Sequence, residues 1–261
     1  MIEFIDTHTH LFVEEFDGDR EAVVKRAVEA GVATLCLPCI DENSLEPLLA
    51  MCAEFPGVCY PMIGLHPTEL GSDYKEVLER MHARVLSDNR FIAIGEVGLD
   101  FYWDETFRKE QIEAFCMQLD WAVETGLPLA IHSRSAFNEL YEIMESYRCH
   151  NLKGVFHCFS GSSEEAEKLL SFDGFCLGVG GVLTYKKSAL PAVLANIPLE
   201  RVLLETDSPY LSPVPYRGKR NESAYVPFVA AAMAAVYGCS LEHVADVTTS
   251  NARRLFTKIA K

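Results

Sequence analysis

The chain has 261 residues, of which 49% are hydrophobic and 23% charged, a composition typical of a globular protein with a sizeable core. A formal net charge of −15 argues against a protein that binds nucleic acid through its overall charge, and no apolar run approaches the roughly 20 residues of a membrane span. Nine cysteines scattered through apolar stretches indicate reduced thiols, so we expect a cytosolic protein with no membrane partner.

Short apolar runs rich in β-branched residues alternate with amphipathic patterns along the chain. We expect strands at residues 3–7, 33–37, 58–63, 91–94, 128–131, 154–156, 174–177 and 202–204. We expect helices at residues 20–30, 44–54, 74–86, 105–124, 136–146, 163–170 and 186–196, followed by an entirely helical segment, 224–261, that packs outside.

This alternation predicts parallel strands joined by crossover helices. Eight such units in one chain of this length are typical of an α/β fold of the (β/α)₈ barrel type, formed here by a single domain over residues 1–261. An open doubly wound sheet would give a similar pattern in its first half. The lack of a G-x-G-x-x-G motif after the first strand argues against the dinucleotide-binding version of that fold.

Histidines and acidic residues follow the predicted strands, where barrel enzymes carry their chemistry. In the opening stretch "FIDTHTH", side chains two positions apart project to one side of a strand, so we expect Asp6, His8 and His10 to form one polar row. The residues that we expect to meet at the carboxyl ends of the strands are His8, His10, His66, Glu96, His132, His157 and Asp207.

Imidazole and carboxylate ligands suit Zn²⁺, Mn²⁺ and similar ions, whereas carboxylates alone would suit Mg²⁺ better. Six of these seven residues acting as ligands would exceed what one catalytic ion takes. We therefore expect two ions about 3.5–4 Å apart that share a carboxylate, for which Glu96 is the natural bridge. Glu205 lies two positions before Asp207 and deeper in the barrel. It is expected to pair with a cation or to orient a ligand histidine.

Two other features are open to more than one interpretation. Cys36 and Cys39 have the spacing of a redox dithiol or half a zinc ribbon, but no second pair exists and Cys36 falls in an apolar strand, which favours buried thiols. The basic segment 216–221 is either a solvated loop or a phosphate-binding loop.

Seven stretches occur in this order along nearly the whole chain: "DTHTH", "GLHP", "IGEVGLDFY", "IHSR", "FHCFSG", "ETDSPYL" and "RGKRNE". Taken together, they resemble the TatD family of metal-dependent deoxyribonucleases, a branch of the amidohydrolase-like barrels. The resemblance implies that His8, His10 and Asp207 hold one ion and that His132 and His157 hold the other, with Glu96 shared between them. It also implies hydrolysis of phosphodiester bonds in DNA, often at the 3′ ends of single strands, with Zn²⁺, Mn²⁺ or Mg²⁺ as the ions.

For catalysis, Glu96 would bridge the ions and Asp207 would accept the proton of the attacking water. Candidates for holding phosphate are His66, Arg134, Lys219 and Arg220. The alternatives are that His66 only caps its strand and that Arg134 pairs with a buried acid such as Glu205. Three aromatic residues could stack on bases or serve only in packing: Tyr102, Trp103 and Tyr185.

The substrate loops depart from the usual family pattern at three positions, namely Thr68, Ser135 and Ser223. Rival functions therefore stay open: hydrolysis of a small amide, lactone or phosphotriester, hydrolysis of the ester in misacylated tRNA, or a metal-binding scaffold that has lost catalysis. An enclosed pocket would favour a small molecule, whereas an open groove along residues 217–221 would favour nucleic acid. Retention of every expected ligand argues against the scaffold, and no obligate protein partner is evident.

Overall fold

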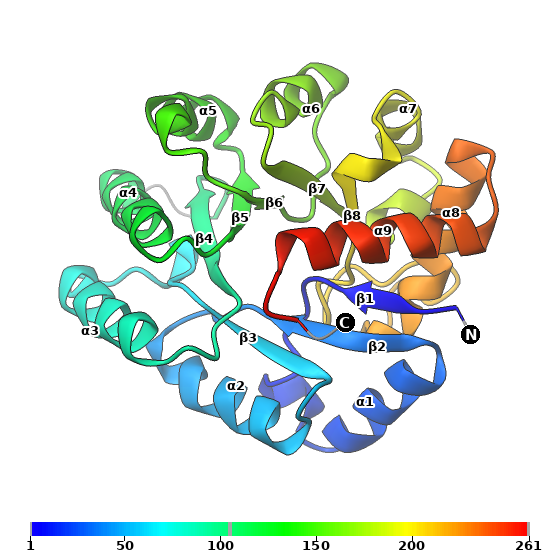
Figure 1. Cartoon of the computed structure of the whole chain (residues 1–261), viewed down its shortest axis with the longest axis horizontal. Coiled ribbons are helices and arrows are strands. Elements are labelled where there is room, and N and C mark those ends of the chain that lie inside the picture. The colour runs from blue at the N-terminus through cyan, green and yellow to red at the C-terminus, as the bar shows by residue number, and fades with distance from the viewer. Residues whose placement is uncertain (1, 104–105, 260–261) are drawn as a thin grey trace.

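The computed structural model describes residues 2–103 and 106–259 and shows eight parallel strands whose neighbours follow chain order (Figure 1). The barrel closes where the backbone N–H of Thr7 donates to the carbonyl of Leu204 at 3.0 Å. The predicted (β/α)₈ barrel is thereby confirmed. The strands are β1 (Phe4–Asp6), β2 (Val32–Leu37), β3 (Cys59–Ile63), β4 (Ala93–Asp100), β5 (Leu129–Arg134), β6 (Gly154–Phe156), β7 (Phe175–Val179) and β8 (Val202–Leu204).

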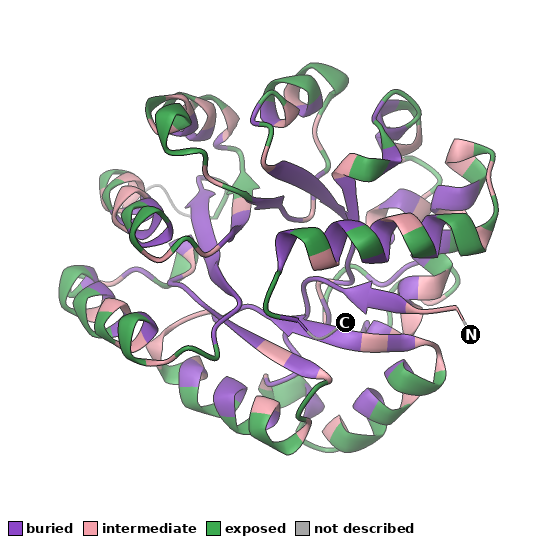
Figure 2. Ribbon diagram, in the orientation of Figure 1, coloured by how far each residue is buried: buried purple, intermediate pink, exposed green. Residues whose placement is uncertain are grey.

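Each strand is followed by a helix, and the helices together surround the barrel (Figure 1). Each turns its buried residues towards the strands and its exposed residues outwards, the pattern expected of amphipathic helices (Figure 2). Among the described residues, side-chain caps start three of these helices, at Asp41, Ser162 and Ser240. The helices are α1 (Arg20–Glu29), α2 (Glu42–Glu54), α3 (Tyr74–Ser87), α4 (Arg108–Thr125), α5 (Phe137–Ser146), α6 (Ser163–Leu170), α7 (Leu190–Leu194), α8 (Val226–Tyr237) and α9 (Leu241–Leu255).

The interior of the barrel has an apolar layer near the amino ends of its strands. Ala130, Val155 and Leu203 belong to this layer, and they share one cluster of buried residues with Leu255 and Phe256 from the carboxyl-terminal segment. Figure 1 shows α9 crossing over the barrel, close to both termini. The end of the chain therefore closes this mouth of the barrel.

Side chains alternate along a strand, so a residue two positions after an inward-facing one also faces inwards. His132 follows Ala130 in this way on β5, and Glu205 follows Leu203 at the end of β8. The same step on β6 leads from Val155 to His157. The period of the strands thus places polar side chains in the layer above the apolar one, at the carboxyl ends.

The structure corrects several expected element bounds. β4 continues to Asp100, so Glu96 lies inside the strand, where the register with β5 shifts between Ile94 and Val97. Such a bulge re-aims nearby side chains. Only residues 190–194 of the expected helix at 186–196 form one, and the first residue of the helix expected at 105–124 lies outside the described residues.

The expected helical segment 224–261 contains the helices α8 and α9. Gly238 ends α8 with a left-handed φ of 63°, and α9 then runs to Leu255. Residues beyond α9 plug the barrel instead of packing outside, and positions 260–261 lie outside the described residues. Within residues 2–103 and 106–259 no single helix has the length and hydropathy needed to cross a membrane, although the bent pair 223–237 and 241–255 passes that test as a pair.

Candidate metal centre

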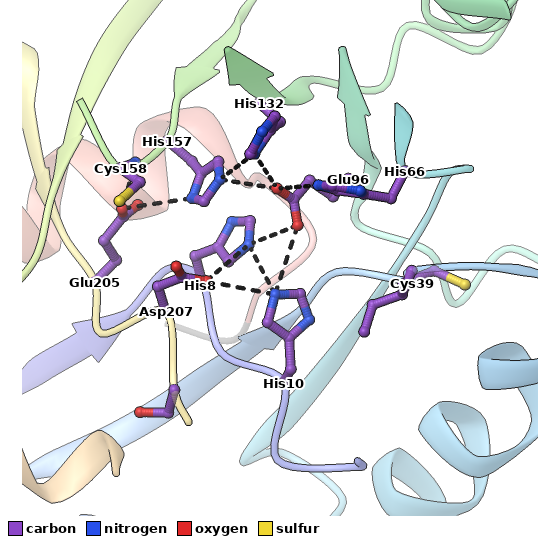
Figure 3. Close-up of polar contacts among 12 residues, drawn as sticks. His8, His10, Cys39, His66, Glu96, His132, His157, Cys158, Glu205 and Asp207 are labelled. Atoms are coloured by element: carbon purple, nitrogen blue, oxygen red, sulfur yellow. Dashed lines mark hydrogen bonds and ion pairs between the residues drawn. The ribbon is translucent and has the colours of Figure 1, made fainter. Parts of the chain in front are cut away.

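Glu96 lies at the centre of a cluster of histidines at the carboxyl ends of the strands (Figure 3). Its side chain is almost fully buried, and its two carboxylate oxygens face different partners. Oε2 lies 3.1 Å from Nε2 of His8 and 3.5 Å from Nε2 of His10. Oε1 lies 2.8 Å from Nε2 of His157 and 3.0 Å from Nδ1 of His132. One carboxylate thus joins two pairs of imidazoles.

The first group consists of His8, His10, Asp207 and one oxygen of Glu96. The Nε2 atoms of His8 and His10 lie 3.3 Å apart, and Oδ1 of Asp207 lies 3.9 Å and 3.5 Å from them. Asp207 adopts a left-handed backbone conformation with φ 57°, and its N–H donates to the carbonyl of His8 at 2.9 Å. This backbone contact ties the loop after β8 to the loop after β1.

The second group consists of His132, His157 and the other oxygen of Glu96. The facing nitrogens of the two histidines, Nδ1 of His132 and Nε2 of His157, lie 3.3 Å apart. His66 belongs to the same cluster, because its Nε2 lies 3.4 Å from Oε1 of Glu96. His66 was expected at this rim and as a candidate phosphate contact, and the structure places it in direct contact with the shared carboxylate.

The spacing within each group fits a metal ion. Ligands bound tetrahedrally at 2.0–2.1 Å lie about 3.3 Å from one another. Both pairs of facing imidazole nitrogens have this separation, and each pair also faces a carboxylate oxygen. Within the described part of the chain, three groups of side chains satisfy the wider geometry of a metal site, namely His8–Glu96–His157, His8–His10–Asp207 and His66–Glu96–His132.

The protonation states favour cation binding as well. Burial alone would raise the pKa of Glu96, but the imidazoles of His157, His66 and His8 hold it well below its usual range. Burial lowers the pKa of His8 and of His66. An ionised carboxylate among neutral imidazoles is the state that metal ligation requires.

His157 and His132 differ from His8 and His66, because neighbouring carboxylates raise the pKa of both rings. Burial opposes a charge on His157, but the carboxylates of Glu96 and Glu205 outweigh burial and raise the pKa of His157 well above its ordinary value. The two carboxylates therefore favour the protonated form of this ring. A metal ion at Nε2 would displace a proton from this ring.

Two further carboxylates contact the outer nitrogens of the second pair of histidines. Oε1 of Glu205 accepts the N–H of Cys158 at 2.5 Å and lies 3.6 Å from Nδ1 of His157. The sequence predicted that Glu205 pairs with a cation or orients a ligand histidine, and its position beside His157 agrees with the second role. Oδ2 of Asp100 lies 2.9 Å from Nε2 of His132. Such contacts fix the ring orientation and the tautomer. Asp100 was not predicted as a site residue, because the strand expected at 91–94 ended before it, whereas β4 continues to Asp100.

Asp6 does not share the polar row of His8 and His10, and that prediction was wrong. Its neighbour Ile5 belongs to the apolar cluster inside the barrel, so Asp6 points to the opposite side of β1. The carboxylate of Asp6 instead accepts the backbone N–H of Thr206 at 3.0 Å and its hydroxyl at 2.6 Å. Asp6 therefore helps to hold β1 against the end of β8.

A cavity of about 590 Å³ opens above the cluster. A second cavity, of about 400 Å³, adjoins it, and Arg134 and His157 line both. The residues that line the first cavity are His10, Ile40, His66, Thr68, Glu69, Glu96, Asp100, Trp103, His132, Arg134, His157, Asp207, Tyr210 and Leu211.

The structure does not bring all of the candidate phosphate contacts to these cavities. None of residues 217–221 lines either one. Arg220 is held elsewhere, because it donates to Asp19 at 2.8 Å and to the carbonyl of Glu15 at 2.6 Å. Lys219 is exposed. Arg134 does line both cavities, and its guanidinium lies over the ring of Tyr102 rather than against Glu205.

The cysteine pair behaves as buried thiols. Cys36 and Cys39 are both free and buried. Burial raises the pKa of the Cys39 thiol to about 12, which is opposite to the lowered pKa of a redox-active cysteine.

Comparison with known proteins gives one consistent result. The family model described as "TatD related DNase" matches residues 5–257. An uncharacterized metal-dependent hydrolase, YabD of Bacillus subtilis, is 36% identical over 252 residues, which cover 96% of this chain and 98% of that protein. The 3′-5′ ssDNA/RNA exonuclease TatD of Pectobacterium carotovorum is 32% identical over 257 residues, covering 96% of this chain and 98% of that protein.

A solved structure resembles the fold over its full extent. The crystal structure of YjjV, a TatD homologue from Escherichia coli K12, matches with a TM-score of 0.90 at 32% sequence identity. The match covers 98% of each chain.

Proposed function

This chain belongs to the TatD related DNase family and is a metal-dependent hydrolase, and we propose that it is a nuclease that releases nucleotides from the 3′ ends of single-stranded DNA. The observation that carries this proposal is the pair of ligand groups that share Glu96 beneath an accessible cavity. Paired metal sites of this kind suit the in-line displacement of a phosphodiester. The curated relative named as a 3′-5′ exonuclease supports the choice of substrate.

In this proposal His8, His10 and Asp207 would hold one divalent ion, His132 and His157 would hold the other, and Glu96 would be shared between the two sites. Zn²⁺, Mn²⁺ and Mg²⁺ are the candidates, and the imidazole-rich ligand sets favour Zn²⁺ or Mn²⁺. When bound, such ions supply positive charge that activates water and neutralises the phosphate. Glu205 and Asp100 keep the rings of His157 and His132 in place through the nitrogens that face away from Glu96.

Asp207 is the proposed acceptor of the proton from the attacking water. Its carboxylate lines the cavity, and its side chain keeps 15% of its surface exposed, whereas Glu96 keeps 4%. Burial would raise its pKa, but His10, His157 and His8 lower the pKa of this carboxyl below its usual value. The group is therefore ionised and ready to accept a proton at neutral pH. His66 and Arg134 are the proposed phosphate contacts because both line the cavity.

The test is digestion of a 5′-labelled single-stranded oligonucleotide by protein that has been stripped of metal and reloaded with each ion in turn. We expect products that shorten from the 3′ end, and no products after chelation. Asp207→Asn should lower kcat by about 100-fold or more, because general base catalysis contributes roughly 10²–10⁴-fold. Asparagine keeps the shape of the side chain and tolerates the left-handed backbone at this position.

The matched control is Asp246→Asn, at an exposed position on α9, which should retain full activity. Glu96→Ala should abolish cleavage. Intact oligonucleotides beside rapid hydrolysis of a small amide, lactone or phosphotriester would reject the nuclease in favour of a small-molecule hydrolase. Misacylated tRNA serves as a separate substrate in the same series.

A further inference from the structure

Two large aromatic side chains stand exposed beside the cavity, directly after β4. Tyr102 is 57% exposed and Trp103 is 68% exposed. Aromatic side chains of this size usually bury most of their surface. Trp103 also lines the cavity together with His132 and Arg134. A flat apolar surface therefore lies next to the proposed metal centre.

Arg134 is stacked on this aromatic pair. The guanidinium carbon lies 3.8 Å from the ring centroid of Tyr102 and 4.9 Å from that of Trp103. Stacking occupies the faces of the guanidinium and leaves its N–H groups along the edges. Among the described residues, no carboxylate or carbonyl accepts a hydrogen bond from this guanidinium. Its donors are therefore free for an anionic group of a ligand, such as a phosphate.

Asp100 fixes the aromatic pair relative to the metal centre. Its Oδ1 accepts the backbone N–H of Tyr102 at 2.9 Å and that of Trp103 at 3.3 Å. Its Oδ2 lies 2.9 Å from Nε2 of His132. Asp100 is buried, so one carboxylate holds both the loop and the ring. The aromatic surface consequently keeps a defined position with respect to Glu96 and its histidines.

We infer that Tyr102, Trp103 and Arg134 form a nucleotide subsite, in which Arg134 binds a phosphate and the exposed face of Trp103 stacks on the base beside the cleaved bond. The inference rests on the proposed nuclease function and adds a specificity-determining residue to it. A base can stack on a side chain only after it has left the base stack of a duplex. The subsite thus explains, in physical terms, a preference for unpaired ends.

The experiment measures kcat/KM for three oligonucleotides. One has a base at every nucleotide, and each of the other two has an abasic residue at one of the two nucleotides that flank the cleaved bond. Base stacking on an aromatic side chain contributes about 5- to 100-fold in affinity. Trp103→Ala should lower kcat/KM by such a factor for the oligonucleotide with the base, and by less than about 2-fold for one of the two abasic oligonucleotides. Trp103→Phe should restore most of the loss.

Phe228→Ala is the matched control, because Phe228 is an exposed aromatic residue that lines neither cavity. It should leave unchanged the ratio of kcat/KM between the oligonucleotide with the base and each abasic oligonucleotide. An equal loss of kcat/KM on all three oligonucleotides after Trp103→Ala, or no loss on any of them, would overturn the stacking subsite. Failure of the unaltered protein to cleave any oligonucleotide would overturn the proposed nuclease instead.

Tryptophan fluorescence gives a second readout that does not depend on turnover. The chain has two tryptophans, and Trp121 is only 4% exposed. An uncleavable phosphorothioate oligonucleotide should quench the emission of the metal-loaded protein, whereas Trp103→Phe should show no quenching. Equal quenching by an uncleavable oligonucleotide that is abasic at every nucleotide would contradict base stacking.

Discussion

Glu205 is fully buried, yet only one of its two carboxylate oxygens has a hydrogen-bond partner among the described residues. A buried charge of this kind is costly unless it serves a partner. Its nearest basic group is His157, whose Nδ1 lies 3.6 Å away. The position of Glu205 is therefore explained by its effect on a ring that faces Glu96 with its other nitrogen.

Replacing this carboxylate should weaken metal binding more than it weakens folding. Glu205→Gln keeps the volume of the side chain but removes the charge that orients His157. We expect metal affinity to fall about 10- to 100-fold, the usual cost of losing the outer partner of a ligand histidine. Competition with a chromophoric chelator measures this affinity directly. Unchanged affinity would show that Glu205 has no part in the site.

Gly178 on β7 leaves the space that Glu205 occupies. A Cβ atom at this position would collide with Oε2 of Glu205, and it would also lie 3.1 Å from the Cα of His157. Gly178→Ala should therefore displace the carboxylate and reduce metal affinity to a similar extent as Glu205→Gln. Gly18→Ala is the control, because nothing lies within 4 Å of its added Cβ. A Gly178→Ala protein that binds metal normally would refute this steric argument.

At the level of elements, the segment after α9 should contribute to stability and not to catalysis. Phe256 is fully buried in the apolar cluster at the amino ends of the strands, the opposite end of the barrel from Glu96. Lys258 adds a hydrogen bond from its Nζ to the carbonyl of Phe91 at 2.9 Å. The plug is thus anchored by packing and by backbone contacts.

Phe256→Ala should lower the free energy of unfolding by about 3–5 kcal/mol, as expected for removal of a buried phenyl group. Urea denaturation measures this loss. Leu86→Ala on α3 is the control, since Leu86 is 53% exposed and should change stability by less than about 0.5 kcal/mol. The folded Phe256→Ala protein should keep its kcat, and a large loss of kcat would show that the plug also shapes the site.

The sequence predicted element type better than element extent. β6 and β8 have the predicted bounds because each is a short apolar run that ends at a polar residue. β4 does not, because its second half carries Glu96 and Asp100, whose burial depends on partners from other strands. The expected helical segment 224–261 was not divided at Gly238, and the way α9 turns back over the barrel depends on packing.

Candidate residues were predictable where a strand ended in a histidine, because the barrel brings all such ends to one rim. Side-chain partners far apart in the sequence were not. Nothing local indicates that Arg220 pairs with Asp19 or that Asp6 serves Thr206. Asp100 was within reach of pattern reasoning, since it lies four positions after Glu96 on one strand, and the two carboxylates contact the two ring nitrogens of the same histidine, His132.

At the scale of the whole molecule, the net charge of −15 opposes a polyanionic substrate at long range. The charged residues that line the cavity are also mostly acidic, with Arg134 as the basic exception. Binding must therefore depend on short-range contacts and on bound cations rather than on a broad basic surface. The acidic residues in the lining are Glu69, Glu96, Asp100 and Asp207.

This charge distribution predicts a weak dependence of activity on monovalent salt. Each phosphate contact to a single strand contributes about −0.7 to the slope of log affinity against log salt. If Arg134 is the main side-chain contact, the slope of kcat/KM should lie near −1 between about 50 and 200 mM KCl at a fixed concentration of metal ion. Arg134→Gln should bring the slope close to zero, because it removes the contact that releases counterions. Lys219→Gln should leave the slope unchanged, since Lys219 lines neither cavity. A slope steeper than about −3, reduced by Lys219→Gln, would instead show that the DNA backbone runs along residues 217–221.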